Sequence, residues 1–273
     1  MMSTKPAPAR LSLRGVGRTF GAHTVLRDVD IEIEPGEVVA LLGASGSGKS
    51  TLLRLIAGLD RPSNGRIEID GEAVRGIDPR CAVVFQEPRL LPWRSLAANV
   101  AYGLPPGAAK GSGAVRHWLD VVGLQEFAGH YPRQVSGGMA QRTGLARALA
   151  RQPQVLLLDE PLAALDALTR LRMQDLLDAV QQEAGTTTVL VTHDVDEAVI
   201  LADRVLILRV LETGASTRGA GIAATHDITI PKPRDRGDSR IAALRDQLLD
   251  ELGVPRRNGA SLRAVLNEEA TVW

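Results

Sequence analysis

The 273-residue sequence has little cysteine, few aromatic residues, little lysine and no long apolar run. Its single cysteine, Cys81, excludes an internal disulfide framework and indicates a reducing compartment. Apolar runs such as residues 38–42 and 155–158 are far shorter than the roughly 20 residues that a membrane-spanning helix needs. Residues 1–10 are polar and lack the apolar segment of a signal peptide. We therefore expect a soluble, cytoplasmic chain.

Net charge is also absent, because 32 Lys and Arg residues balance 32 Asp and Glu residues. A neutral balance argues against a protein that coats nucleic acid or an anionic membrane through bulk charge. The hydrophobic fraction of 44% and the charged fraction of 23% are ordinary for a globular protein and too apolar for a disordered one. Only four basic residues are lysine, namely Lys5, Lys49, Lys110 and Lys232.

Short apolar segments alternate with segments of helical periodicity along the chain. This pattern predicts an α/β protein with a mainly parallel sheet. We expect strands near residues 29–33, 38–42, 67–69, 83–85, 155–158, 189–191 and 205–208. Helices are expected after residue 50, over 165–180 and over 241–252.

The composition also suggests a division of the chain. Residues 1–9 are expected to form a flexible tail, residues 10–230 the main domain, and residues 231–273 a C-terminal extension. Pro and Gly punctuate residues 88–151, which predicts a helical subdomain inserted into the α/β core. Residues 209–230 are rich in Gly, Ala and Thr, and the sequence assigns them no role.

A glycine-rich loop follows the apolar run 38–42 and matches the phosphate-loop pattern G-x-x-x-x-G-K-[ST]. Such a loop turns backbone N–H groups inward around phosphate, and the following helix directs its positive end at the same oxygens. The alternative is a flexible Gly/Ser turn that happens to end in lysine. The predicted ATP-binding residues are Gly43, Ala44, Ser45, Gly46, Ser47, Gly48, Lys49, Ser50 and Thr51.

Within this loop, Lys49 is expected to bridge the β and γ phosphates and Ser50 to hold Mg²⁺. A second strand, 155–158, leads directly into Asp159 and Glu160. Acids at the carboxyl end of a parallel strand lie on the ligand side of an α/β sheet. Asp159 would contribute to the Mg²⁺ site, and Glu160 would act as general base on the attacking water. The alternative is a solvated acidic pair without a ligand.

A third motif, Ser136, Gly137 and Gly138, precedes a helix and offers a hydroxyl and exposed amides to an anion. Alone it is equally well a plain serine N-cap. With the phosphate loop and the acid pair, however, the sequence resembles the ATP-binding cassette family, in which Ser-Gly-Gly is the signature loop. The resemblance covers residues 10–210 and implies the phosphate-loop NTPase fold of that family, with an antiparallel β subdomain and an inserted helical subdomain.

The resemblance extends to four further residues. Gln86 matches the family's Q-loop glutamine, which contacts Mg²⁺ and the attacking water. Asp166 matches the D-loop, with Ala164 where serine is usual. His193 matches the switch histidine that contacts the γ phosphate, although a lone His after a strand is more often structural. Phe20 matches an aromatic residue that stacks on adenine, the alternative being a core Phe.

The resemblance further implies ATP and Mg²⁺ as cofactors and a head-to-tail homodimer in which the signature loop contacts the partner's ATP. Residues 85–93 and the tail 231–238 resemble importer subunits of the nitrate/sulfonate/taurine group. That group implies two integral membrane permease subunits, an indirect periplasmic or lipid-anchored solute-binding protein and a peripheral location on the cytoplasmic face of the inner or plasma membrane. The apolar residues Leu90, Leu91, Pro92 and Trp93 would dock on a permease helix, unless they form a buried loop.

These comparisons lead us to expect Mg²⁺-dependent ATP hydrolysis coupled to solute import, with aliphatic sulfonates favoured. The nearest alternatives are the same role for taurine, nitrate or a thiamine-precursor pyrimidine. A cassette protein acting on DNA or ribosomes is less favoured, and we expect no nucleic-acid partner. A small-molecule phosphotransferase would have no use for residues 136–138.

Overall fold

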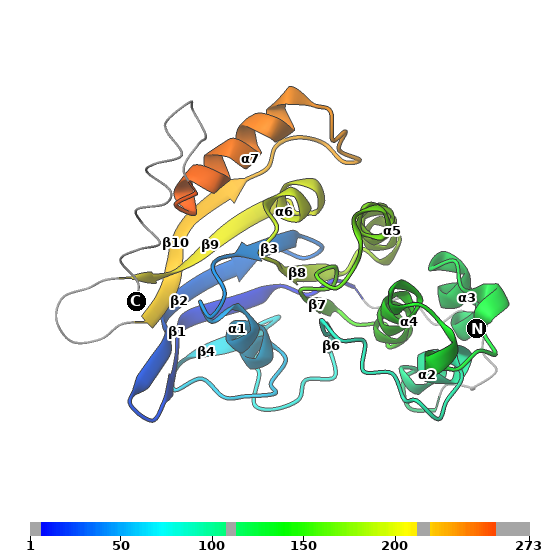
Figure 1. Ribbon diagram of the computed structural model, residues 1–273. Helices are drawn as coiled ribbons and strands as arrows, with labels where there is room; N and C mark the ends of the chain where they lie inside the picture. The colour runs from blue at the N-terminus through cyan, green and yellow to red at the C-terminus, as the bar shows by residue number, and fades with distance from the viewer. Residues whose placement is uncertain (1–6, 108–112, 212–218, 255–273) are drawn as a thin grey trace, which may run out of the picture.

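The computed structural model describes residues 7–107, 113–211 and 219–254, and Figure 1 shows their arrangement. The strands are β1 (Leu11–Phe20), β2 (His23–Ile33), β3 (Val38–Leu42), β4 (Asn64–Ile69), β5 (Glu72–Ala73), β6 (Cys81–Val84), β7 (Val155–Asp159), β8 (Thr187–Val191), β9 (Arg204–Leu211) and β10 (Gly219–Asp227). The α-helices are α1 (Lys49–Ile56), α2 (Leu96–Tyr102), α3 (Gly113–Val121), α4 (Gly137–Ala150), α5 (Ala167–Ala184), α6 (Val195–Leu201) and α7 (Ser239–Glu251). Two short 3-10 helices span Gln125–Phe127 and Pro132–Gln134.

The described strands form one ten-stranded sheet in the order β5-β4-β1-β2-β10-β9-β3-β8-β7-β6. The neighbours from β9 to β6 pair in parallel, whereas β1, β2, β4 and β5 pair antiparallel, as do β9 and β10. The parallel part places the carboxyl ends of β3, β6, β7 and β8 at the same edge, where the loops to the following elements begin. The predicted α/β fold is therefore confirmed.

Helices cover both faces of the parallel strands, and β3 shows why. Its five residues are all buried, and they alternate between two cores. Val38, Ala40 and Leu42 pack with α5 and α6 on one face, while Val39 and Leu41 pack with α1 on the other. Figure 1 shows α1 on one side of the sheet and α5 and α6 on the opposite side. A strand buried on both faces needs apolar residues throughout, which explains the continuous run.

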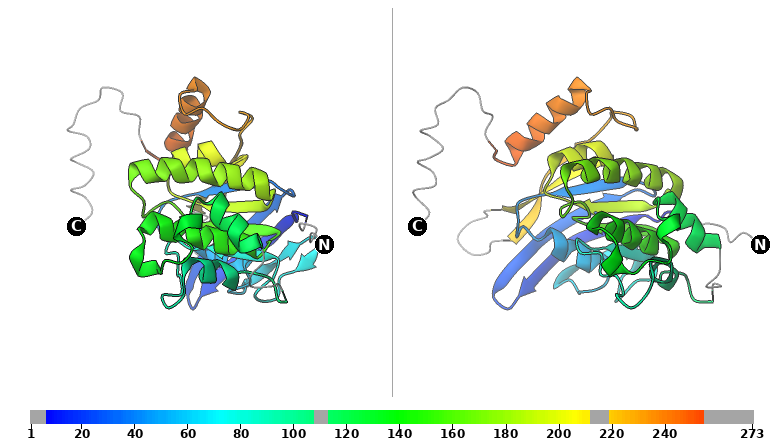
Figure 2. Two further views of the ribbon diagram at one scale, coloured as in Figure 1. Left: turned by 90° about the vertical axis from the view of Figure 1, so that its right-hand side faces the viewer. Right: turned by 45° about the vertical axis from the view of Figure 1, so that its right-hand side comes forward.

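Residues 96–150 carry a small core of their own. Helices α2, α3 and α4 pack around apolar residues that include Leu96, Val100, Leu119 and Ala146. Figure 2 shows this group projecting beside the sheet below α5. Among the described residues, none of the helices is long and apolar enough to cross a membrane.

Four features differ from the sequence expectations or go beyond them, and the first is strand β1, where no strand was expected. Strand β10 lies within residues 209–230, to which the sequence assigned nothing, and it pairs with β9 and with β2. The strand expected at 83–85 is β6, which spans Cys81–Val84. It ends before Phe85, whose carbonyl accepts a hydrogen bond from Gln141 Nε2 at 3.1 Å instead of pairing within the sheet. Residues 1–6 of the expected tail lie outside the described residues, whereas Ala9 is buried and its carbonyl accepts from Thr187 Oγ1.

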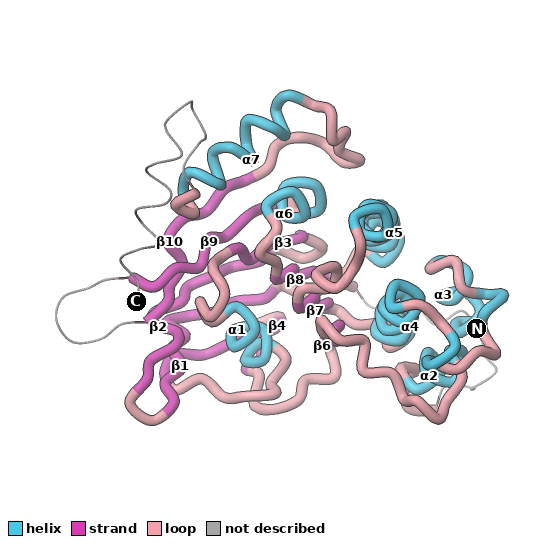
Figure 3. The backbone as a smooth tube through the Cα atoms, in the orientation of Figure 1, coloured by secondary structure: helices cyan, strands magenta, loops and turns pink. Residues whose placement is uncertain are grey.

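Residues 231–251 pack on the main body of the protein. Arg234 is buried and donates to the carbonyl oxygens of Val199, Ile200 and Ala202 at the end of α6. Those carbonyls have no partner within the helix, so the guanidinium satisfies them. Helix α7 adds Ile241 and Leu248 to the core that α6 also lines. The tube in Figure 3 shows α7 running next to α6. The expected residues 255–273 of the extension lie outside the described part.

Candidate nucleotide-binding and catalytic site

The glycine-rich loop joins β3 to α1, as the sequence predicts. Two of its glycines are required, Gly43 by space and Gly48 mainly by its backbone conformation. A Cβ at Gly43 would collide with the Leu208 carbonyl oxygen, and one at Gly48 would lie 2.9 Å from Leu26 Cδ2. Gly48 also has φ of 96°, a left-handed conformation that favours glycine. The loop is thereby fixed between the strand and the helix N-terminus.

Lys49 is the first residue of α1, and its side chain lies back over the loop. The residue is 5% exposed, and its Nζ donates to the carbonyl oxygens of Gly43 at 2.8 Å and Ala44 at 2.9 Å. Burial lowers the pKa of Lys49, while the nearby carboxylates of Glu160 and Asp159 act in the opposite direction. The ammonium group is therefore held at the loop by weak carbonyl acceptors, which an anion can replace.

Ser50 and Asp159 come together from different parts of the chain. Ser50 Oγ donates to Asp159 Oδ1 at 2.9 Å, which joins the start of α1 to the end of β7. Burial raises the pKa of Asp159, and the hydrogen bond from Ser50 opposes that rise. A hydroxyl and a carboxylate are oxygen ligands of the kind that Mg²⁺ prefers.

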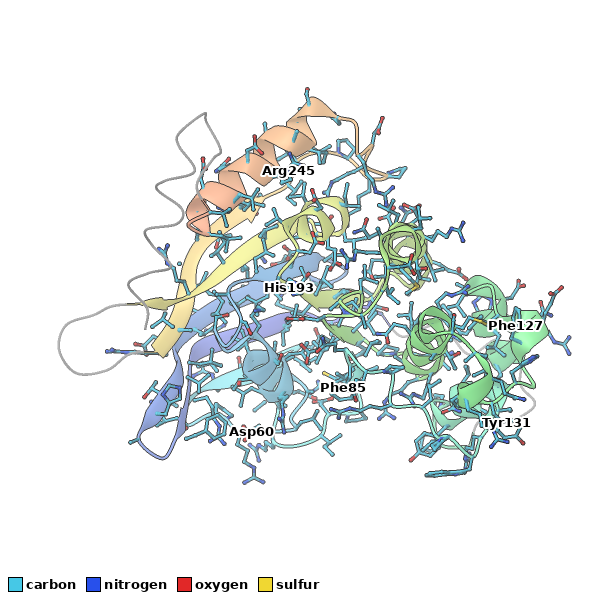
Figure 4. All side chains as sticks on the ribbon, viewed as in Figure 1. Asp60, Phe85, Phe127, Tyr131, His193 and Arg245 are labelled. Atoms are coloured by element: carbon cyan, nitrogen blue, oxygen red, sulfur yellow. The ribbon has the colours of Figure 1, made fainter. Side chains whose placement is uncertain are left out.

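Glu160 follows Asp159 in a strained backbone conformation. Its φ is 45°, in the left-handed region, which costs a non-glycine residue of order 1–3 kcal/mol. Its N–H donates to the Val191 carbonyl at 2.9 Å, and its Oε2 lies 3.2 Å from His193 Nδ1. The turn thus brings a carboxylate from the end of β7 against an imidazole that follows β8. His193 is labelled in Figure 4, near the middle of the molecule.

Gln86 and Phe20 lie nearer the surface. Gln86 is exposed in the loop after β6, and among the described residues its side chain makes no hydrogen bond. Phe20, at the end of β1, is 47% exposed, and the Arg18 guanidinium lies 4.1 Å from its ring centroid. Arg18 is held there by Asp60 through bonds of 2.9 and 3.0 Å. Phe20 is therefore not a core residue.

Ser136 and Asp166 have equivalent positions on two other helices. Ser136 is the N-cap of α4, where its Oγ accepts from Met139 N at 3.3 Å, and Asp166 is the N-cap of α5, where it accepts from Thr169 N at 3.0 Å. Both residues are exposed, as is Gly137. Figure 1 shows α4 among the helices on the right of the view, away from α1. Within the described part of the chain, no hydrogen bond joins these residues to the glycine-rich loop.

Four residues behind the site were not predicted from the sequence. Thr192 Oγ1 donates to Glu197 Oε2 at 2.7 Å, and Arg170 pairs with Glu197 Oε1 at 3.9 Å and with Asp194 Oδ2 at 3.6 Å. Glu197 is 2% exposed, and burial raises its pKa to about 7. A possible sequence signal is Glu197 itself, an acid among apolar residues of α6 and four positions after His193.

The glycine-rich loop between a strand and a helix places this chain in the class of phosphate-loop nucleotide-binding proteins. The lysine, the serine–aspartate pair and the second acid facing a histidine are the groups expected around a bound phosphate in that class. The family model for ABC transporters matches residues 26–163. The chain is also similar to aliphatic sulfonates import ATP-binding proteins of Xanthomonas axonopodis pv. citri (49% identical; 89% of this chain and 94% of that protein) and Granulibacter bethesdensis (51%; 89% and 94%). The chain belongs to the ABC transporter family.

The solved structures agree with this family. The ATP-binding cassette MJ0796, in a dimeric post-hydrolysis state bound to ADP and Pi, is 32% identical to this chain. Its TM-score is 0.67, and the match covers 80% of this chain and 98% of that one. The family expected from the sequence motifs is therefore confirmed.

Proposed function

We propose that this protein binds ATP with Mg²⁺ and hydrolyses it to drive import of an organosulfur solute through a membrane permease. The observation that carries the proposal is the convergence of Lys49, the Ser50–Asp159 pair and the Glu160–His193 pair at one edge of the parallel sheet. These groups come from the start of α1, the end of β7 and the loops that follow β7 and β8, and together they supply a cation, metal ligands and a base.

The residues of the loop fit a nucleotide triphosphate. Ser47 Oγ is buried and has no hydrogen-bond partner among the described residues, so it has an unused donor inside the loop. Lys49 would exchange its carbonyl contacts for the β and γ phosphates. Gly43 to Gly48 and Thr51 would contribute backbone and side-chain contacts to phosphate. The half-exposed ring of Phe20 would stack on adenine.

The metal and the reaction are assigned to separate groups. Ser50, Asp159 and Gln86 would hold Mg²⁺, which neutralises charge on the phosphates when it is bound. Glu160 would accept the proton of the attacking water, and His193 would orient Glu160 and contact the γ phosphate. The strained backbone at Glu160 supports this assignment, because such strain persists where position matters more than local stability.

The exposed motifs on the helical side support a homodimer. Among the described residues, no hydrogen bond joins Ser136, Gly137, Gly138 or Asp166 to the glycine-rich loop of their own chain, yet they present a hydroxyl and helix N-terminal amides to an anion. The dimeric cassette among the structural relatives supports the same arrangement. Each ATP would then lie between one subunit's glycine-rich loop and its partner's residues 136–138.

A surface beside the glutamine loop is proposed to dock the permease. Trp93 is 71% exposed, which excludes a buried loop, and Tyr102 lies nearby under Arg94. The loop is nevertheless rigid: buried Asn99 accepts from Leu91 N–H and donates to three carbonyl groups of residues 91–95. This loop starts at Gln86, so a change at the nucleotide would be transmitted through it to the permease. The permease would consist of two subunits docked at the cytoplasmic face of the membrane, and these subunits would receive solute from a separate binding protein.

Aliphatic sulfonates are the favoured solute because the relatives that match most of this chain carry that name. The test is deletion of the gene, followed by growth on an alkanesulfonate, taurine or sulfate as sole sulfur source and on nitrate as nitrogen source. Loss of growth on the alkanesulfonate alone supports the assignment. Loss on taurine or nitrate instead would replace it.

Hydrolysis is tested with Glu160→Gln. This substitution removes the base but keeps the size of the side chain, so ATP should bind and remain. We expect turnover to fall by about 10²–10³-fold and an ATP-bound dimer to accumulate in gel filtration. A monomer with unchanged turnover would refute the role of Glu160.

A further inference from the structure

Arg170 occupies an unusual position in the first turn of α5, just after Asp166. Its Nη2 donates to the Leu165 carbonyl at 3.2 Å, in the loop that enters the helix. Its Nη1 lies 3.6 Å from Asp194 Oδ2 and its Nε lies 3.9 Å from Glu197 Oε1. One guanidinium group therefore contacts both the loop before α5 and the start of α6.

The residues on either side of His193 in the sequence, Thr192 and Asp194, make the contacts at the start of α6. Thr192 donates to Glu197, and Asp194 N–H donates to Thr192 Oγ1 at 3.0 Å. Asp194 also caps α6 by accepting from the N–H groups of residues 196 and 197. Both neighbours of His193 are thus fixed by the group of charges that includes Arg170, and His193 itself faces Glu160.

The start of α5 also lies against Gly138 of the signature loop. A Cβ at Gly138 would lie 2.9 Å from Thr169 Cγ2 and 3.8 Å from Leu165 Cδ2. Leu165 is the same residue whose carbonyl accepts from Arg170. The surface assigned to the partner's nucleotide is therefore linked through a single turn of α5 to the residues that flank His193.

We propose that Arg170 is a positioning residue: it holds His193 against Glu160 and links that contact to the loop between Gly138 and Asp166. Engagement of residues 136–138 with the partner's nucleotide would then alter the geometry of the catalytic pair in the same chain. This inference rests on the proposed ATP hydrolysis by a dimer. The competing explanation is that Arg170 only neutralises the buried carboxylate of Glu197.

Glu197 makes the two explanations separable. Burial raises its pKa to about 7, whereas Thr192 and Arg170 act to lower it. Any cation at position 170 would serve neutralisation, so Arg170→Lys should then be harmless. Positioning requires the guanidinium fork, because only the fork reaches the Leu165 carbonyl and both acids together, and an ammonium group cannot do so.

The experiment uses the full-length chain with Mg²⁺ and ATP and compares Arg170→Lys, Arg170→Met and the control Arg172→Met. Arg172 is an exposed arginine on the same helix. We expect both Arg170 variants to lose about 10-fold in kcat with KM for ATP within twofold, and the control to match the parent chain. Thermal unfolding of Arg170→Lys should match that of the parent chain, which separates positioning from misfolding.

A double-variant cycle completes the test. If Arg170 acts through His193, Arg170→Lys should cause no further loss in a His193→Ala background. Full activity of Arg170→Lys, or an equal additional loss in that background, would overturn the inference. A parent chain that does not hydrolyse ATP would refute the proposed function as well, whereas hydrolysis that ignores position 170 refutes only this inference.

Discussion

Two regions of the molecule carry the predicted motifs, and they differ in how those motifs are satisfied. At the carboxyl ends of the parallel strands, functional side chains contact one another, as in the Ser50–Asp159 and Glu160–His193 pairs. At the starts of α4 and α5, Ser136 and Asp166 are exposed, and in the part of the chain that the structure describes their side chains bond only to the first turns of their own helices. In Figure 4, His193 lies near the middle of the molecule, whereas Phe127 and Tyr131 lie in the helical part at the right.

The difference indicates which half of the site a single chain can complete. The strand ends hold the Ser50–Asp159 pair and the Glu160–His193 pair, and the carboxylates of Asp159 and Glu160 lie near enough to Lys49 to act on its pKa. This is a preorganised half. The helix starts have the features of an anion site, but within the described ranges they bond only to their own helices. A second copy placed head to tail would complete both, which accords with the proposed dimer.

The largest expected effect comes from the preorganised half. Lys49→Ala removes the ammonium at the phosphates, and we expect ATP hydrolysis to fall by 10²-fold or more, with loss of most nucleotide affinity. Binding of a fluorescent ATP analogue measures the affinity. Lys232→Ala is the control, because Lys232 pairs with Asp203 outside the site. Normal ATP binding by Lys49→Ala would refute the role of the glycine-rich loop.

A smaller effect is expected from the exposed half. Ser136→Ala should lower hydrolysis by about 10-fold, because one hydrogen bond to a charged phosphate is lost, while ATP binding by the monomer stays unchanged. Ser95→Ala is a matched control, since Ser95 caps α2 by accepting the same kind of bond from Ala98 N. Ser136→Ala and Ser95→Ala should each lose about 1 kcal/mol of unfolding free energy. Equal hydrolysis by the two would remove the signature assignment.

The smallest effect concerns Glu197, which lies where α5 and α6 meet, and it appears only as a pH dependence of the free energy of unfolding. Burial raises the pKa of Glu197 to about 7, against about 4.3 in an unfolded chain. Between these values the unfolded state releases its proton first, so this residue lowers stability as pH rises from about 4.5 to 7 and adds no further change above 7. Glu197→Gln should reduce the loss of unfolding free energy between about pH 4.5 and 7. Urea unfolding of both chains at pH 5 and pH 8 measures this loss, and an equal loss in the parent chain and in the variant would contradict the prediction.

Much of the preorganised half could be predicted from the sequence, because local pattern and topology determine it. Residues 38–42 and 155–158 are apolar throughout since both faces of a parallel strand are buried, and the ligand-side residues follow directly. Strand β1 was not predicted, because its alternation is interrupted at Gly15, where φ is 58° and the register with β2 shifts. Strand β10 depends on pairing with β9 instead of on its own composition.

The contacts between the halves could not be predicted from the sequence. Arg170 looks like any arginine on a helix surface, and only the packing of α5 on α6 brings it to Asp194 and Glu197. The buried Arg234 has the same character, since its partners are carbonyls at the end of α6. Such roles arise from the tertiary fold, and no short pattern encodes them.

Cross-linking tests most directly whether two chains complete each nucleotide site. One chain would carry Ser45→Cys in the glycine-rich loop and a second chain Gly137→Cys in the signature loop, both at exposed positions. The native Cys81 should not react, because burial raises the pKa of its thiol to about 12. With a short bismaleimide, we expect cross-linked pairs of the two different variants only when ATP is present. ATP-independent yield, or pairs formed only between identical variants, would contradict the head-to-tail arrangement.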